Sequence, residues 1–287
     1  MASKEKAIYL VIDINHINST LAVMTTKRQL AFKAEKTAAT MDIGIKNLKK
    51  SYDQLKGQSD YRIVKLLCAV PKPNTENGTF TDYRMLPWNN QPLLVHLAHT
   101  FKCPVQLVNR YELEALGEAT FGAGKSDRVM MYYHVGNNVS GTCIVEQKLE
   151  RSFFRYRPEH QLIAQTHGNY QTLEELISLR NLEEQLNRSK ENISKSTLLA
   201  EMEQHLAVGL FNGMTHWGQP GVIVIGGSLA HDLSPKNIRE ALEALGTGKA
   251  PKVKRAEKSG YGPLYGALAL IRAESKKPAP ATDEAEV

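Results

Sequence analysis

The feature that most constrains the fold is a strand that turns directly into a helix within residues 103–118. The apolar, β-branched run Val105–Val108 predicts a strand, and after the polar pair Asn109 and Arg110 apolar side chains recur at helical spacing. This arrangement favours an α/β fold. Many α/β enzymes place their chemistry at such a polar pair, so these two residues are the first candidate site.

Similar patterns extend over the rest of the chain. Apolar or alternating runs predict strands at residues 7–14, 19–24, 30–34, 63–70, 128–135, 142–145, 222–225 and 253–257. Helical periodicity predicts helices at residues 41–56, 92–101, 173–186, 195–217, 235–245 and 263–273. We predict two α/β domains, at residues 1–108 and 109–275, with the last helix returning to the first domain. The Pro-, Ala- and acid-rich segment 276–287 is predicted to be a disordered tail.

Composition narrows the classes of function. The chain has 287 residues, room for about two domains, and a net charge of +6 from scattered basic residues. Aromatic side chains do not interleave with them, so we favour a solvated surface over nucleic-acid binding. No apolar run approaches the roughly 18 residues that span a bilayer, and we find no signal peptide, so we expect a cytoplasmic protein without a membrane partner. Cys68, Cys103 and Cys143 are expected to be buried thiols.

Further motifs follow residues 103–118 along the chain. Residues 136–142 form a glycine-containing turn between two strands, His160 and Glu174 lie in a polar segment, and Gly226-Gly227 ends a strand. Over roughly residues 7–273, these motifs in this order resemble the ROK family of repressors, open reading frames and sugar kinases, and its hexose kinases in particular. The resemblance implies a two-domain, actin-like ATPase (ribonuclease H-like) fold of the sugar-kinase type.

The catalytic motifs of that family are altered here. The resemblance places the general base of the kinases at Arg110, which stays protonated and cannot accept the proton of a sugar hydroxyl. The first phosphate loop keeps only Asp13, because Asn15, His16 and Ile17 replace its two glycines and threonine. We interpret Asn15 and His16 as a polar turn. Loss of a general base alone typically costs on the order of 10² to 10⁴ in rate.

The resemblance assigns nucleotide binding to four positions, Asp13, Gly136, Gly226 and Gly227. In the loop 136–142, Asn138 and Ser140 replace middle glycines, so we expect weaker binding of an anion there. At Gly226-Gly227 a structural role, the close packing of a helix on the sheet, is at least as favoured as retained adenine binding.

The resemblance also assigns ligand binding to five positions, Asn109, Arg110, Arg157, His160 and Glu174. Arg157 replaces a sugar-binding glutamate of the family. Two arginines in one sugar pocket repel each other unless an anion lies between them or acids pair with them. The alternatives are a pocket for a sugar phosphate or another small anion, and internal pairing with Glu112, Glu159 or Glu174. We favour internal pairing.

The family's cysteine-rich zinc motif has lost its cysteines at residues 165–174. His160 and His167 supply two ligands, whereas structural zinc needs about four, so we expect no metal. We favour hydrogen-bonded loop histidines instead, in a loop that packing of Phe154 and Tyr170 would hold.

Three functions remain open. We predict a non-catalytic, ROK-like regulatory or interaction protein. The alternatives are a hexose kinase with atypical machinery, using His16 or His160 as base, and a structural subunit that pairs with an active paralogue. ATP and magnesium would be cofactors only of the kinase. A homodimer, or a heterodimer with a related kinase, is expected from the family. No helix-turn-helix precedes residue 7, so we expect no DNA-binding domain.

Overall fold

The computed structural model describes residues 5–82, 84–150, 156–166, 169–188, 193–246 and 248–276. The chain forms two compact units, one of residues 1–110 with 266–287 and one of residues 111–265. It leaves the first unit within α3 (Arg110–Phe121) and returns to it within α8 (Gly262–Ser275). Of the helices described, none has both the length and the apolar composition that crossing a bilayer requires.

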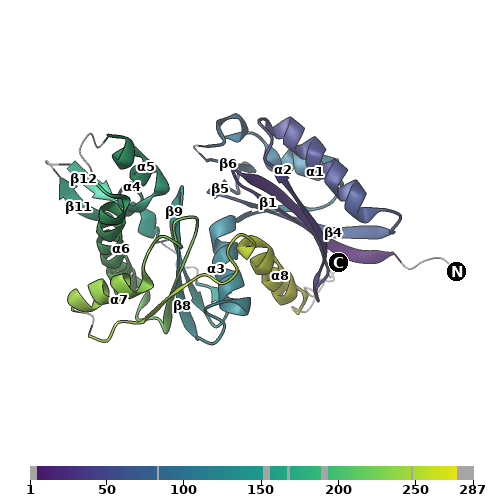
Figure 1. The fold of residues 1–287 in the computed structure, drawn as a ribbon. Helices are drawn as coiled ribbons and strands as arrows, with labels where there is room; N and C mark the ends of the chain where they lie inside the picture. Colours follow the sequence, from purple (N-terminus) through teal and green to yellow (C-terminus); the bar gives the residue numbers. More distant parts are fainter. Residues whose placement is uncertain are drawn as a thin grey trace, which may run out of the picture. The chain divides into compact units, whose positions relative to one another are not determined.

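The first unit is built on a five-stranded sheet of order β3-β2-β1-β4-β7 (Figure 1). Its strands are β1 (Lys6–Ile14), β2 (Asn18–Met24), β3 (Gln29–Lys36), β4 (Tyr61–Val70) and β7 (Val105–Asn109). The first three form an antiparallel meander, and β4 and β7 extend it in parallel to β1. The apolar run of β1 is buried because strands pair with it on both sides and helices cover the sheet.

Two helices pack on this sheet, α1 (Met41–Lys56) and α2 (Leu93–Phe101). On α1, Met41, Ile45, Leu48 and Tyr52 are buried at helical spacing and join the core of β1 and β4. This unit also contains the short hairpin of β5 (Pro73–Asn74) and β6 (Thr79–Phe80), and the 3₁₀ helix η1 (Leu86–Trp88).

The second unit repeats this topology in a sheet of order β10-β9-β8-β13-β14. Its strands are β8 (Val129–Val135), β9 (Val139–Val145), β10 (Lys148–Leu149), β13 (Val222–Gly226) and β14 (Lys252–Arg255). The first three are again antiparallel neighbours, and β13 and β14 again run parallel to β8. Each unit therefore places the carboxyl ends of its parallel strands along one edge of its sheet.

Helices cover both faces of the second sheet (Figure 1). On one face lie α4 (Leu173–Ile177), α6 (Lys195–Trp217) and α7 (Pro235–Ala244), and on the other lies α3. Side chains of β8 alternate between them: Met131 and Tyr133 join the α6 core, whereas Met130 and Tyr132 join the α3 core. By the same alternation His134, next on that face, points toward α3.

The structure corrects the prediction of a single helix at residues 173–186. Two helices, α4 and α5 (Leu179–Arg188), meet at Ser178, whose backbone is extended. The Leu179 amide donates to the carbonyl of Gly136 at 2.8 Å. This hydrogen bond ties the start of α5 to the loop after β8 instead of continuing α4. Thr172 begins α4 with a capping box to Glu175.

A hairpin stands where the sequence suggested a loop held by side-chain packing. Strands β11 (Leu162–Thr166) and β12 (Asn169–Thr172) pair antiparallel, and the 3₁₀ helix η2 (Pro158–His160) precedes them. Tyr170 is 63% exposed, so the expectation that its packing holds this segment was wrong. Backbone pairing holds the segment instead. Phe154, His167 and residues 277–287 lie outside the described residues.

Glu118 of α3 fixes the segment that leads into α8. Its side chain is 1% exposed, and its carboxylate accepts hydrogen bonds from three backbone amides: Ala123 at 2.8 Å, Glu257 at 3.1 Å and Lys258 at 2.5 Å. A buried carboxylate with three amide donors is a strong, directional link between α3 and the chain after β14.

We predict that Glu118→Gln lowers the free energy of unfolding by about 2–3 kcal/mol, because the amide nitrogen of glutamine would face backbone donors. Chemical denaturation followed by circular dichroism measures this loss. The control is Glu240→Gln, since Glu240 is 60% exposed and its ion pair with Lys236 lies on the surface of α7. Equal stability of the two variants would contradict a structural role for Glu118.

Candidate functional site

Sheet topology brings the first candidate residues together in the first unit. Asp13 lies near the carboxyl end of β1, and Asn109 is the last residue of β7, which runs parallel through β4. Arg110 follows as the first residue of α3. Because parallel strands end at the same edge of a sheet, residues 97 positions apart in sequence become neighbours.

Arg110 and Asp13 form an ion pair at this edge. The Arg110 Nε donates to Asp13 Oδ1 at 3.1 Å, and Nη2 donates to Oδ2 at 3.4 Å. The side chains are 12% and 5% exposed, so the pair is almost removed from solvent. Two parallel hydrogen bonds to one carboxylate are the strongest geometry a guanidinium offers. This partner is not one of the three glutamates that the sequence suggested.

The turn between β1 and β2 satisfies its own backbone amides. The Asn15 side-chain oxygen accepts from the amides of Ile17 at 2.9 Å and Asn18 at 3.1 Å. The Thr37 hydroxyl donates to the Asn15 carbonyl at 2.6 Å. These bonds give the turn the geometry of an Asx turn, in which a side chain takes the amide protons that a phosphate loop would offer to a ligand.

A buried polar group in the second unit was missed by sequence reasoning. The Nδ1 of His134 lies 2.7 Å from Oε2 of Glu114, and the Tyr132 hydroxyl donates to the same oxygen at 3.0 Å. His134 and Glu114 are each 8% exposed. The imidazole packs on the Tyr111 ring, with centroids 4.5 Å apart, and the Tyr111 hydroxyl accepts from Asn138 at 3.0 Å.

A sequence signal for this group does exist. Tyr132 and His134 alternate onto one face of the predicted strand, and Glu114 and Glu118 recur at i and i+4 among the alanines of the preceding helix. Acidic residues on the small-residue face of a helix indicate buried partners. The sequence does not indicate that the helix of Glu114 packs on the strand face of Tyr132 and His134.

Contacts within the chain itself require glycine at positions 226 and 227. A Cβ on Gly226 would collide with the Tyr132 hydroxyl, and one on Gly227 would collide with the Val135 carbonyl. Gly227 also has φ of 95°, which favours glycine. These contacts account for both residues through the packing of β13 beside β8.

Three other predicted ligand residues lie around η2 and in α4. Arg157 precedes η2 and His160 ends it, and both are exposed. Glu174 lies in α4, where its carboxylate accepts from the Val139 amide at 3.2 Å and links α4 to the start of β9. Within the described ranges, no three His, Cys, Asp or Glu side chains cluster as metal ligands would.

Comparison with known proteins assigns these motifs to one family. The model of the ROK family matches residues 9–274. This chain belongs to the ROK family. Among curated protein sequences, no significant match to the chain was found.

Solved structures of ROK proteins share the fold. A ROK hexokinase from Thermus thermophilus is 19% identical, with a TM-score of 0.78 over 94% of this chain and 99% of that chain. A ROK family glucokinase from Streptomyces griseus, solved with glucose and AMPPNP, is 18% identical, with a TM-score of 0.71 over 93% and 99%. A ROK family transcriptional regulator, a homolog of the E. coli MLC protein, is 16% identical, with a TM-score of 0.71 over 93% and 78%.

These likenesses confirm the predicted fold class, the two-domain actin-like ATPase fold of ROK sugar kinases. At identities below 25% they speak for the fold alone. The residues that would carry chemistry in this ROK protein must therefore be judged by their own contacts.

Buried thiols and phenols of this ROK protein are held in their protonated forms. Burial raises the pKa of the Cys143 thiol to about 11 and raises the pKa of Cys68 further. Burial also raises the pKa of Tyr133 well above its usual value, and its hydroxyl donates to the Gly209 carbonyl at 3.3 Å. These groups therefore serve as packing residues and donors rather than as nucleophiles at neutral pH.

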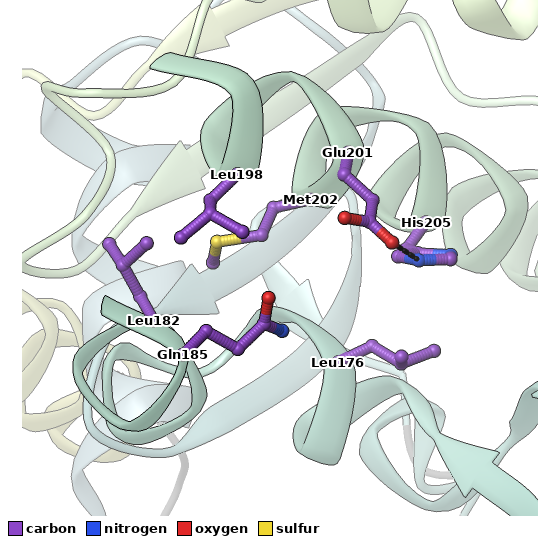
Figure 2. A pocket seen from close by; sticks show the side chains of 7 residues that line it. All are labelled: Leu176, Leu182, Gln185, Leu198, Glu201, Met202 and His205. Carbon is purple, nitrogen blue, oxygen red and sulfur yellow. Dashed lines mark ion pairs between the residues drawn. The ribbon is translucent and has the colours of Figure 1, made fainter. Parts of the chain in front are cut away.

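A small hollow lies between α4–α5 and α6 (Figure 2). Leu182, Leu198 and Met202 form an apolar wall, and His205 and Glu201 approach to 3.6 Å at its rim. None of the residues predicted for ligand or nucleotide binding lines it. Its polar rim is an ordinary i, i+4 pair on an exposed helix face.

We predict that Arg110→Ala lowers the free energy of unfolding by about 3–5 kcal/mol, because it leaves the Asp13 carboxylate buried without its charged partner. Asp13→Ala should cost a similar amount. The double variant should lose less than the sum of the two, since the pair is removed as a unit. Denaturant titration of all four proteins measures the coupling, and additive losses would contradict an energetically linked pair.

Proposed function

We propose that this ROK protein does not phosphorylate sugars and acts instead as a regulatory or interaction protein that recognises a small anion such as a sugar phosphate. One observation carries the proposal. The position of the family's general base is Arg110, and its guanidinium is engaged by the carboxylate of Asp13. A guanidinium cannot accept the proton of a sugar hydroxyl, and the nearby Asp13 carboxylate is already paired with this guanidinium.

The phosphate loops support the same proposal. The residues present fit MgATP poorly: the amides of Ile17 and Asn18 are satisfied by Asn15, and the Tyr132 hydroxyl fills the space beside Gly226. Gly226 and Gly227 are explained by packing, so their presence alone does not argue for a bound nucleotide.

The fold is compatible with both activities. Structures similar to this chain include a ROK hexokinase and a ROK family transcriptional regulator, so the architecture serves catalytic and non-catalytic proteins alike. The proposal includes self-association or pairing with a related kinase, because proteins of this family commonly dimerise. Size-exclusion chromatography with light scattering would detect it.

A second candidate is a hexose kinase with an atypical base, and one contact favours it. His134 has the carboxylate of Glu114 on its Nδ1, the arrangement that orients a catalytic imidazole. His160, proposed as a base from the sequence, is exposed and makes no hydrogen bond or ion pair through its side chain with the residues described. His134 is therefore the stronger base for this reading.

A turnover assay separates the two candidates. Purified protein is incubated with MgATP and a panel of hexoses, and ADP release is followed by a coupled assay. We expect no sugar-dependent ADP release above the protein-free control. Sugar-dependent release that His134→Gln abolishes and Arg157→Ala preserves would overturn the proposal in favour of the atypical kinase.

A further inference from the structure

The strand β3 leaves an open edge on the sheet of the first unit. The sheet order places β2 on one side of β3 and, among the described residues, no strand on the other. β3 has 8 residues, whereas the other edge strands of the two five-stranded sheets, β7, β10 and β14, have 5, 2 and 4. No proline interrupts β3. An edge of this length presents a row of backbone donors and acceptors with which another strand can pair.

Backbone alternation determines which residues of β3 face this edge. The Thr37 amide donates to the Ile17 carbonyl at 3.0 Å, and the antiparallel register between β3 and β2 continues from this pair. The hydrogen bonds to β2 therefore fall on the odd-numbered residues of β3, and the backbone groups of Phe32, Ala34 and Lys36 point away from β2. All three residues are exposed, Phe32 to 44%.

Two side chains of opposite charge flank Ala34 on this strand. The Nζ of Lys33 lies 2.8 Å from Oε1 of Glu35, and the two side chains are 38% and 32% exposed, so each can meet a further charge. The hydrogen bond from Lys33, followed by the bond from the Ser51 hydroxyl at 2.7 Å, lowers the pKa of Glu35. Glu35 is therefore ionised at neutral pH, and the strand carries a positive and then a negative charge.

This order of charges is self-complementary about Ala34. If two copies of β3 run antiparallel with Ala34 opposite Ala34, Lys33 of each copy lies opposite Glu35 of the other. These are non-hydrogen-bonded positions, at which side chains approach most closely. In the same register the outward backbone groups of Phe32 meet those of Lys36. Sliding one copy by two residues, the smallest slide that keeps the backbone bonds, places Lys33 opposite Lys33 or Glu35 opposite Glu35.

We infer that two copies of this chain pair through β3, in an antiparallel register centred on Ala34, so that their sheets join edge to edge. The contact is isologous and uses the open edge of both copies, so it closes at a dimer. This inference rests on the proposed function, because it assigns the self-association to one strand. Charges on an edge strand disfavour pairing with other strands, whereas a second copy in this register matches them.

Charge reversal tests the contact. Light scattering after size-exclusion chromatography, at low salt and several protein concentrations, measures the dimer. We expect the wild-type chain to dimerise. Lys33→Glu and Glu35→Lys should each raise the dissociation constant at least about tenfold, because each places like charges opposite each other at both symmetry-related pairs. The control is Lys46→Glu, which makes the same charge change at an exposed position of α1 and should dimerise as the wild type does.

A mixture of the two variants separates the contact from local effects on folding. In a heterodimer of Lys33→Glu with Glu35→Lys, every glutamate at these positions lies opposite a lysine. We therefore expect an equimolar mixture to form a heterodimer with about the wild-type affinity, although each variant alone is mainly monomeric. Failure of the mixture to dimerise would contradict the register centred on Ala34.

A cysteine variant reports the register directly. Ala34→Cys places one thiol of each copy opposite the other at a Cα separation of about 5.5 Å, within the range that a disulfide spans. We expect mild oxidation to give a covalent dimer on a non-reducing gel. Gln29→Cys, exposed on the same strand, faces no residue of the second β3 in this register and should stay monomeric on that gel. The wild-type chain is the blank for the native cysteines, and equal cross-linking of the two variants would contradict the register.

The outcomes distinguish failure of this contact from failure of the proposed function. If the wild type dimerises and both charge-reversal variants dimerise equally well, pairing through β3 is overturned and self-association stands. If the wild type is monomeric at every concentration, self-association fails and this inference fails with it, while the turnover assay still decides whether sugars are phosphorylated. Loss of the dimer in a chain truncated after Lys276 would assign the contact to residues 277–287 and overturn the inference.

Discussion

The Asp13–Arg110 ion pair is the contact on which the candidate site of the first unit depends. It joins the carboxyl end of the central strand β1 to the first residue of α3, the helix in which the chain passes to the second unit. A nearly buried pair of this kind is costly to break, although it adds little over apolar packing. The arginine is thus not a lone cation at the start of α3, because the neighbouring carboxylate serves as its counter-ion.

Helix α3 also carries two buried carboxylates that belong to the second unit. Glu114 and Glu118 lie one turn apart, a spacing at which like charges repel on an exposed helix. Both are buried, and their partners differ: Glu114 meets His134 and the Tyr132 hydroxyl, whereas Glu118 meets backbone amides. One carboxylate therefore holds the His134 imidazole, and the other fixes the segment before α8.

Sequence patterns predicted elements well where packing repeats locally. The bounds expected for the helices at residues 41–56 and 195–217 match α1 and α6, because their buried side chains follow the helical period. The break at Ser178 and the hairpin at residues 162–172 were not predicted, since a bond from Leu179 to Gly136 and cross-strand pairing arise from tertiary contacts. The partners of Arg110 and His134 were missed for the same reason, as they lie 97 and 20 positions away.

The contrast between glycines and charged residues explains why a kinase-like sequence can be a poor guide to kinase chemistry. Gly226 and Gly227 are required by the Tyr132 hydroxyl, the Val135 carbonyl and a positive φ, whatever the site binds. A family motif can thus persist for packing alone. Charged and polar side chains do not meet this packing requirement of the glycines. Among them, the chain has an arginine paired to an aspartate and a histidine oriented by a glutamate. The two charged pairs, rather than the glycines, are therefore the groups on which the proposed function rests.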